Sequence, residues 1–131
     1  MKVLQRLAPL FARIALAAAF LSAVAGRFGL WTGALHWDSF ERFHARVAAL
    51  NPWAPAYLIP VLAWSATIAE TTLAILLIAG VAKRWTAFGA AALLFWFATA
   101  MVFADGVKSP LDYSVYSASA CALLLALRER S

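Results

Sequence analysis

Residues 58–80 read LIPVLAWSATIAETTLAILLIAG, an apolar run that contains a single acidic residue, Glu70. A helix of about 20 mostly apolar residues crosses a bilayer whose hydrocarbon core is about 30 Å thick, so this stretch predicts a membrane-spanning helix. At about 1.5 Å per residue, Glu70 lies about 15 Å from the Gly80 end of that helix, deep in the membrane. An isolated charge at that depth is costly. Glu70 is therefore expected either to lock helices together as a neutral, hydrogen-bonded acid or to take a direct part in function.

The composition of the whole chain indicates an integral membrane protein. Of its 131 residues, 65% are hydrophobic and 13% are charged, and the mean hydropathy is +0.82. Soluble domains are about half apolar and a quarter charged. The net charge of +5 comes from residues at predicted helix ends, so the expected partner is the lipid bilayer and not nucleic acid. The single cysteine, Cys121, excludes an internal disulfide and a Cys-x-x-Cys redox pair.

Four apolar segments predict an all-α fold, a single membrane domain over residues 1–131 built as a bundle of four transmembrane helices. The spans are expected at about 7–28, 57–81, 85–104 and 110–127. The first span could instead be a cleaved signal peptide, because Ala23, Val24 and Ala25 fit the small-x-small cleavage pattern. Arg13 interrupts the apolar core that a signal peptide would need, which favours a retained helix.

The segment between the first two spans predicts a short amphipathic helix over about 38–50. Apolar residues recur there at helical spacing and charged residues occupy the other side, which is typical of a helix lying at the membrane interface. The apolar positions are Trp37, Phe40, Phe43, Val47 and Leu50, and the charged ones are Glu41, Arg42 and Arg46. His36 and His44 are the only histidines, and without a third ligand nearby they are weak candidates for metal binding.

The distribution of charge predicts the orientation of the bundle. Cytoplasmic loops are enriched in lysine and arginine. The side that holds both termini and the turn between the second and third spans is therefore expected to be cytoplasmic, with the amphipathic helix outside. Its basic residues are Lys2, Arg6, Lys83, Arg84, Arg128 and Arg130, and its one acid is Glu129.

A possible ion pair and a possible pocket are the candidate functional features. Arg13 lies about 9 Å above the inner boundary of the first span. There it either pairs with Glu70 through charge-assisted hydrogen bonds or extends to the cytoplasmic headgroups.

The first half of the fourth span is unusually polar, and with nearby aromatic residues it could enclose a pocket suited to a quinone headgroup. The alternative is an aromatic belt combined with serine-mediated helix packing. The candidate pocket residues are Trp37, Trp64, Thr67, Tyr116 and Ser117. The chain carries no phosphate-binding loop, dinucleotide fingerprint or haem attachment motif, so catalytic residues stay unassigned.

The sequence resembles the DoxX family of small four-helix membrane proteins. The resemblance covers almost the whole chain and rests on four stretches: FARIALAAAF (11–20), NPWAPAYLIPVLAW (51–64), TIAETTLAILLIAGVAKRWTAFGAAALL (67–94) and GVKSPLDYSVYSASACALLLAL (106–127). It implies a multi-pass protein of the bacterial inner membrane with a buried polar core of Arg13, Glu70, Asp112 and Tyr113. Arg27 stands where many members have a lysine or a small residue, so the resemblance assigns it no role.

Three functions are compatible with these features. The resemblance implies a membrane subunit of a quinone-linked redox system, because one family member is a subunit of a thiosulfate:quinone oxidoreductase and another is associated with oxidative-stress complexes. Such a chain would be an accessory subunit beside a membrane or periplasmic oxidoreductase, with quinone as its possible ligand. The alternatives are a non-catalytic membrane scaffold, and a small-solute or proton-coupled transporter acting as a homo-oligomer.

Overall fold

The computed structural model describes residues 1–30 and 40–129, and every regular element in these ranges is a helix. The long helices are α1 (Lys2–Arg27), α3 (Ile59–Ala79) and α4 (Lys83–Asp105). The shorter ones are α2 (Phe40–Leu50), the 3₁₀ turn η1 (Ala56–Leu58), α5 (Lys108–Asp112) and α6 (Val115–Arg128). Three helical segments of the described chain are long and apolar enough to cross a membrane: Lys2–Arg27, Ala56–Ala79 and Lys83–Asp105.

The predicted fourth span is not one continuous helix. The sequence predicts one helix over residues 110–127, but the helix breaks after α5, where Ser114 has a left-handed φ of +57°. Serine side chains compete with the backbone for hydrogen bonds and favour turns over helix interiors, which fits a break in this polar stretch. The remaining apolar helix, α6, has 14 residues and is about 21 Å long at 1.5 Å per residue, shorter than a hydrocarbon core.

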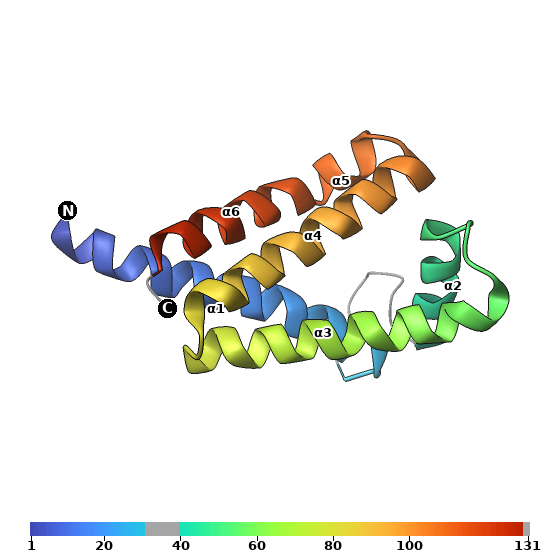
Figure 1. Ribbon diagram of the computed structural model, residues 1–131, viewed down its shortest axis with the longest axis horizontal. Coiled ribbons are helices and arrows are strands. Elements are labelled where there is room, and N and C mark those ends of the chain that lie inside the picture. Colours follow the sequence, from blue (N-terminus) through green and yellow to red (C-terminus); the bar gives the residue numbers. More distant parts are fainter. Residues whose placement is uncertain (31–39, 130–131) are drawn as a thin grey trace.

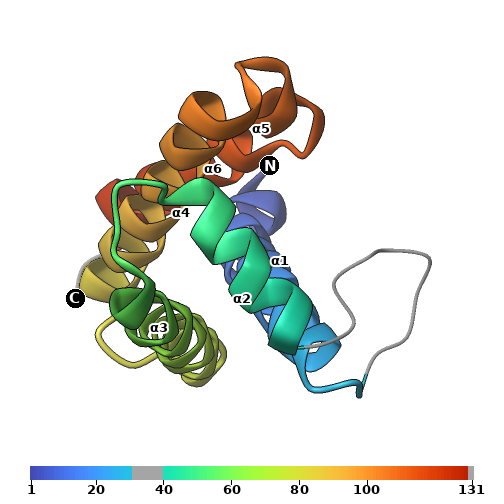
Figure 2. The same ribbon diagram turned by 90° about the vertical axis from the view of Figure 1, so that its right-hand side faces the viewer.

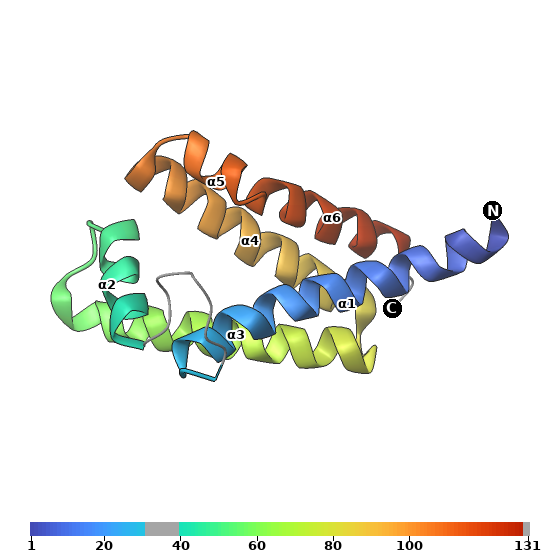
Figure 3. The same cartoon turned by 180° about the vertical axis from the view of Figure 1, so that it is seen from behind.

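The helices form two antiparallel pairs, α1 with α3 and α4 with α6. The pairs lie close together at one end, where α3 turns into α4, and diverge toward the other end, where α2 lies across the gap (Figure 1). The view onto that end shows α2 running from the α1 side toward α4 (Figure 2). From behind, α1 runs alongside α3, and its first turns extend past the end of α6 (Figure 3). We call the two ends the narrow end and the wide end.

Small side chains allow the close approach at the narrow end. The buried cluster at this end contains seven alanines, and five of them are completely buried. Small side chains of this kind let helix backbones pack closely. Ser119 on α6 adds a hydrogen bond of 2.8 Å to the carbonyl oxygen of Ala91 on α4. The buried cluster comprises Leu16, Ala17, Phe20, Ala74, Leu77, Ala87, Ala90, Ala91, Ala122, Leu125 and Ala126.

The turn between α3 and α4 depends on Gly80. Gly80 has a φ of +73° and donates its N–H to the carbonyl oxygen of Leu76, ending α3 in the left-handed conformation that glycine adopts without strain. A side chain there would also meet Arg13, because a Cβ atom would lie 2.7 Å from Arg13 Nη2. The sequence of this turn thus fixes the antiparallel arrangement of α3 and α4.

The amphipathic helix predicted over about 38–50 corresponds to α2, with residues 38 and 39 outside the described ranges. Val47 on its apolar face is buried against Ile59 and Ala63 of α3, with Phe40 and Phe43 packed around them. Burying a valine side chain contributes about 1.5–3 kcal/mol in water. This contact therefore holds α2 onto the first turns of α3 at the wide end.

Candidate functional site

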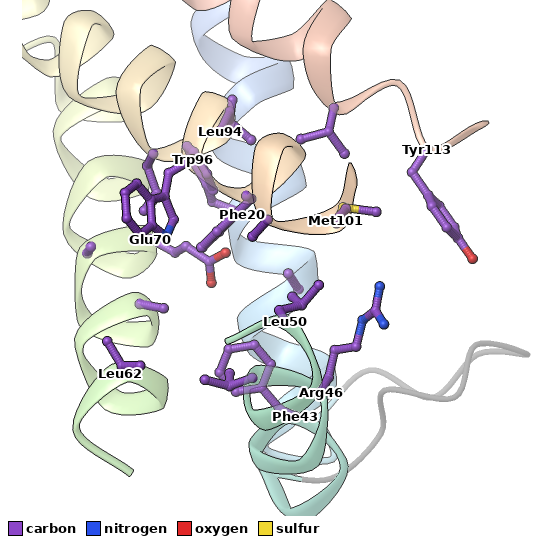
Figure 4. Close-up of a pocket in the computed structure, with 18 of the residues that line it drawn as sticks. Phe20, Phe43, Arg46, Leu50, Leu62, Glu70, Leu94, Trp96, Met101 and Tyr113 are labelled. Carbon is purple, nitrogen blue, oxygen red and sulfur yellow. The ribbon is translucent and has the colours of Figure 1, made fainter. Parts of the chain in front are cut away.

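A cavity of about 1000 Å³ lies between the two helix pairs toward the wide end. Side chains from α1, α2, α3 and α4 line it, together with a few residues from α5 and the start of α6, and most of them are apolar (Figure 4). The cavity exists because the pairs diverge beyond the narrow-end core. Its large apolar side chains include Phe20, Phe43, Leu62, Leu94, Trp96, Phe97 and Met101.

The wall of this cavity contains a buried ion pair between Arg27 and Glu70. Arg27 ends α1 and is 6% exposed, while Glu70 in the middle of α3 is 4% exposed. Arg27 Nη1 also donates a hydrogen bond of 3.1 Å to Thr67 Oγ1, and the guanidinium lies over the ring of Phe43, 3.5 Å from its centroid. The cluster of Arg27, Phe43, Thr67 and Glu70, which we call the polar cluster, therefore connects α1, α2 and α3.

Each member of the polar cluster is placed by the secondary structure around it. Thr67 and Glu70 are three residues apart on α3 and so share a face. Thr67 also donates its hydroxyl to the carbonyl oxygen of Ala63, which fixes its side chain. A buried charge requires a partner. Because α1 runs antiparallel to α3, its last residue reaches the level of Glu70 and supplies that partner.

The predicted pairing of Arg13 with Glu70 is wrong. Arg13 Nε donates a hydrogen bond of 2.8 Å to the carbonyl oxygen of Leu77, and Nη2 donates one of 3.3 Å to that of Ile78. These carbonyls belong to the last turn of α3, where backbone acceptors lack helical partners and a cation is favourable. Leu77 is about 10 Å beyond Glu70 along the helix. Arg13 thus stabilises the end of α3, and its contact with cytoplasmic headgroups stays a prediction.

Two further members of the predicted polar core are also exposed instead of buried. Asp112 forms an ion pair of 2.7 Å with Lys108, one turn earlier in α5, and both side chains are more than half exposed. Tyr113 is 60% exposed and lies at the cavity edge, away from Glu70 (Figure 4). The break at Ser114 separates this segment from α6, so it does not enter the bundle as a continuous span would.

The predicted ligand pocket is also assembled differently. Trp64 is 48% exposed and stacks on Phe40 with ring centroids 4.5 Å apart, outside the cavity lining. Tyr116 shares a hydrogen bond of 3.2 Å with Thr99 and lines a separate hollow of about 490 Å³ between α4 and α6. Ser117 is exposed. Of the five predicted residues, only Thr67 belongs to the polar cluster, and Trp37 lies outside the described residues.

A second ion pair, between Arg46 and Asp105, joins α2 to the end of α4 at the wide end. Both residues line the cavity and are partly exposed. Ser109 Oγ donates a further, longer hydrogen bond of 3.4 Å to Asp105. Together with the packing of Val47, this pair holds α2 across the wide end of the cavity.

Metal binding finds no added support in the described part of the chain. No group of three or more histidine, cysteine, aspartate or glutamate side chains there could hold an ion. His44 is half-buried on α2, and His36 lies in the segment 31–39 that is not described.

Sequence reasoning missed Arg27, although a signal for it existed. Arg27 follows Arg13 by fourteen residues, about four helical turns, so both arginines lie on the same face of α1. That face of α1 packs on α3, and the two arginines contact α3 at two different heights along its axis.

Compared with models of protein families, with curated proteins and with solved structures, the chain finds no match. The resemblance to the DoxX family stays an expectation, and function has to be argued from the cavity itself.

Proposed function

We propose that this chain is a multi-pass membrane protein that binds a lipophilic molecule of the quinone class in the cavity and serves as the membrane subunit of a quinone-linked redox system. The observation that carries the proposal is the buried Arg27–Glu70 pair in the wall of a largely apolar cavity. The electron-transferring partner would be a membrane or periplasmic oxidoreductase, as the resemblance to the DoxX family implies.

The shape and chemistry of the cavity support a ligand of this class. Small-molecule sites are typically about 300–1000 Å³, mostly apolar, with a few polar groups that fix orientation, and the cavity of about 1000 Å³ fits that description. Arginine carries five N–H donors in a fixed plane, which suits the carbonyl oxygen of a quinone. Thr67 and Phe43 hold the guanidinium in place.

Glu70 gives the site a group that can exchange a proton. Reduction of a quinone consumes protons as well as electrons, and the electrons would come from the partner oxidoreductase. Glu70 faces the cavity from the middle of α3 (Figure 4), where a carboxyl group is within the membrane and next to the proposed headgroup position. In this proposal Arg27 orients the headgroup and Glu70 gives or takes the proton.

The proposed setting is the bacterial inner membrane with both termini in the cytoplasm. The lysines and arginines near the termini and in the α3–α4 turn support that orientation through the positive-inside rule. The wide end, with α2 and the polar cluster, then lies toward the outer side. The fourth crossing would be made by α5 and α6 together, residues 108–128.

Mass spectrometry of lipids that co-purify with the protein in mild detergent tests the proposal. Wild type, Glu70→Gln and the control Glu41→Gln are compared; Glu41 is exposed on α2 and does not line the cavity. We expect near-stoichiometric quinone with wild type and control, and loss of quinone from Glu70→Gln with unchanged helical circular dichroism. Wild type that carries phospholipid but no quinone would contradict the proposal, as would full retention by Glu70→Gln.

A scaffold function is the second candidate, because the polar cluster also ties three helices together. In that case Glu70 is structural, quinone is absent from all three samples, and a protein partner is retained by every variant that folds. A transporter is less well supported. The narrow-end core of tightly packed alanines closes the cavity on that side, so the described residues form no continuous path.

A further inference from the structure

Part of the wide end of the cavity is covered by α2. Phe43, Val47 and Leu50 of α2 line the cavity, so the helix forms part of its wall. The ion pair between Arg46 and Asp105 joins this helix to α4 on the far side of the gap. A molecule arriving from water at the wide end would pass beside α2 and this ion pair.

The side between α3 and α4 is built differently. Near the narrow end the helices touch, since a Cβ atom placed on Gly89 of α4 would lie only 3.2 Å from Leu73 Cδ2 of α3. Farther toward the wide end, α3 presents the small residues Ser65, Ala66 and Ala69 to the cavity, while α4 presents Trp96.

Two of these residues combine a place in the cavity lining with a large exposed fraction. Ser65 is exposed, and Trp96 is 61% exposed, yet both line the cavity. Figure 4 shows Trp96 on the α3 side of the cavity. The wall between α3 and α4 is therefore thin at this level, formed by small side chains on one helix and an indole ring on the other.

This thin wall lies at the depth of the hydrocarbon core. Ser65 is about 9 Å and Ala69 about 15 Å along α3 from Ile59, at 1.5 Å per residue. Trp96 is in the middle of α4, and both helices belong to the segments that are long and apolar enough to cross a membrane. In the proposed membrane setting, the neighbour of this opening is lipid and not water.

We propose that the opening between α3 and α4, bounded by Ser65, Ala66, Ala69 and Trp96, admits the ligand sideways from the bilayer. This inference rests on the proposed function and narrows it, because the ligand is then drawn from molecules dissolved in the membrane. Trp96 is the residue that the ligand passes, and its flat ring offers a stacking surface to a flat molecule.

The test narrows the opening and measures the rate of ligand exchange. Ser65→Phe places a ring in the opening, and the matched control Ser117→Phe places one at an exposed position on α6 that does not line the cavity. Each protein is reconstituted in bilayer nanodiscs that contain a benzoquinone with a short isoprenoid tail. Exchange of bound quinone for an isotopically labelled form is followed by native mass spectrometry, and Arg46→Ala is included to loosen the wide end.

We expect Ser65→Phe to slow exchange by about tenfold or more, a change within the range over which association rates vary among related complexes. The amount bound at equilibrium should change little. Ser117→Phe should exchange at the wild-type rate, and Arg46→Ala should not exchange markedly faster than wild type. Equal rates for Ser65→Phe and wild type would overturn the inference, as would equal slowing by Ser117→Phe or marked acceleration by Arg46→Ala. If wild type binds no quinone at all, the proposed function itself fails.

Discussion

Replacing Arg27 by methionine should destabilise the protein more than any other single charge removal in the bundle. The side chain keeps much of its length but loses the guanidinium, so the buried carboxylate of Glu70 loses its ion-pair partner. Removing one partner of a buried pair costs about 3–5 kcal/mol. The contact of the guanidinium with the Phe43 ring, 3.5 Å from its centroid, accounts for about 0.5–2 kcal/mol of favourable interaction in comparable pairs. We expect the free energy of unfolding of Arg27→Met to fall by about 3–5 kcal/mol in total, because protonation of Glu70 offsets part of these two contributions.

A double-mutant cycle separates the ion pair from the packing of Arg27. Glu70→Gln in the Arg27→Met background removes the orphaned charge, so the double variant should recover part of the loss, with a coupling energy of about 2–3 kcal/mol. The free energy of unfolding is measured by reversible titration with sodium dodecyl sulfate, followed by circular dichroism and tryptophan fluorescence. Arg6→Met is the matched control, because Arg6 is exposed on the same helix. The ion pair would be refuted if Arg27→Met lowered the free energy of unfolding by an amount within about 1 kcal/mol of the effect of Arg6→Met. Additive effects of Arg27→Met and Glu70→Gln in the cycle would refute it as well.

Three further predictions concern the helix ends. Arg13→Leu should lower the free energy of unfolding by about 1–3 kcal/mol, since it removes two hydrogen bonds to the last carbonyls of α3. In the detergent titration this effect should add to that of Glu70→Gln. Strong coupling between the two variants would instead support an Arg13–Glu70 ion pair. Ser114→Gly should raise the unfolding free energy by up to about 1 kcal/mol, because Ser114 has a φ of +57°, and a loss would contradict this account of the helix break. Arg46→Ala should change the free energy of unfolding by less than about 1 kcal/mol, because the pair with Asp105 is partly exposed. It should nevertheless speed hydrogen exchange of the α2 amides. Unchanged exchange would show that the pair does not hold α2.

Hydropathy and periodicity were sufficient to predict the long apolar helices and the amphipathic segment. Both signals are local: the length of an apolar run sets a span, and the spacing of Phe40, Phe43 and Val47 sets the face of α2. The burial of Glu70 followed from its place in the middle of such a run, and the structure confirms it at 4% exposure.

The partner of Glu70 could not be predicted because it depends on the register between two helices. Arg13 and Arg27 lie on the same face of α1, and the sequence does not say which of them stands level with the middle of α3. The structure sets that level through the core around Leu16, Phe20 and Leu77. Arg13 then falls opposite the α3 terminus.

The interrupted fourth helix and the pocket were missed for a related reason. Position 114 is a serine and not a glycine or proline, so the sequence gives no strong signal for a helix break there. Sequence reasoning therefore places the polar residues around it in a continuous span and in the candidate quinone pocket. The cavity itself comes from the divergence of the two helix pairs, a tertiary feature that no single segment encodes. The residues lining it are consequently dispersed along the chain, from Ala19 on α1 to Val115 on α6.

Photoaffinity labelling tests the central claim, that the cavity beside Arg27 and Glu70 binds a membrane-dissolved quinone, most directly. An azido-benzoquinone with a short isoprenoid tail is incorporated with the protein in bilayer nanodiscs, irradiated, and mapped by peptide mass spectrometry with and without excess unlabelled quinone. The account predicts competed labels on cavity-facing residues of α1, α3 and α4, close to Arg27, Glu70 and Trp96. Labels confined to the outward faces of the helices, or insensitive to competition, would contradict it.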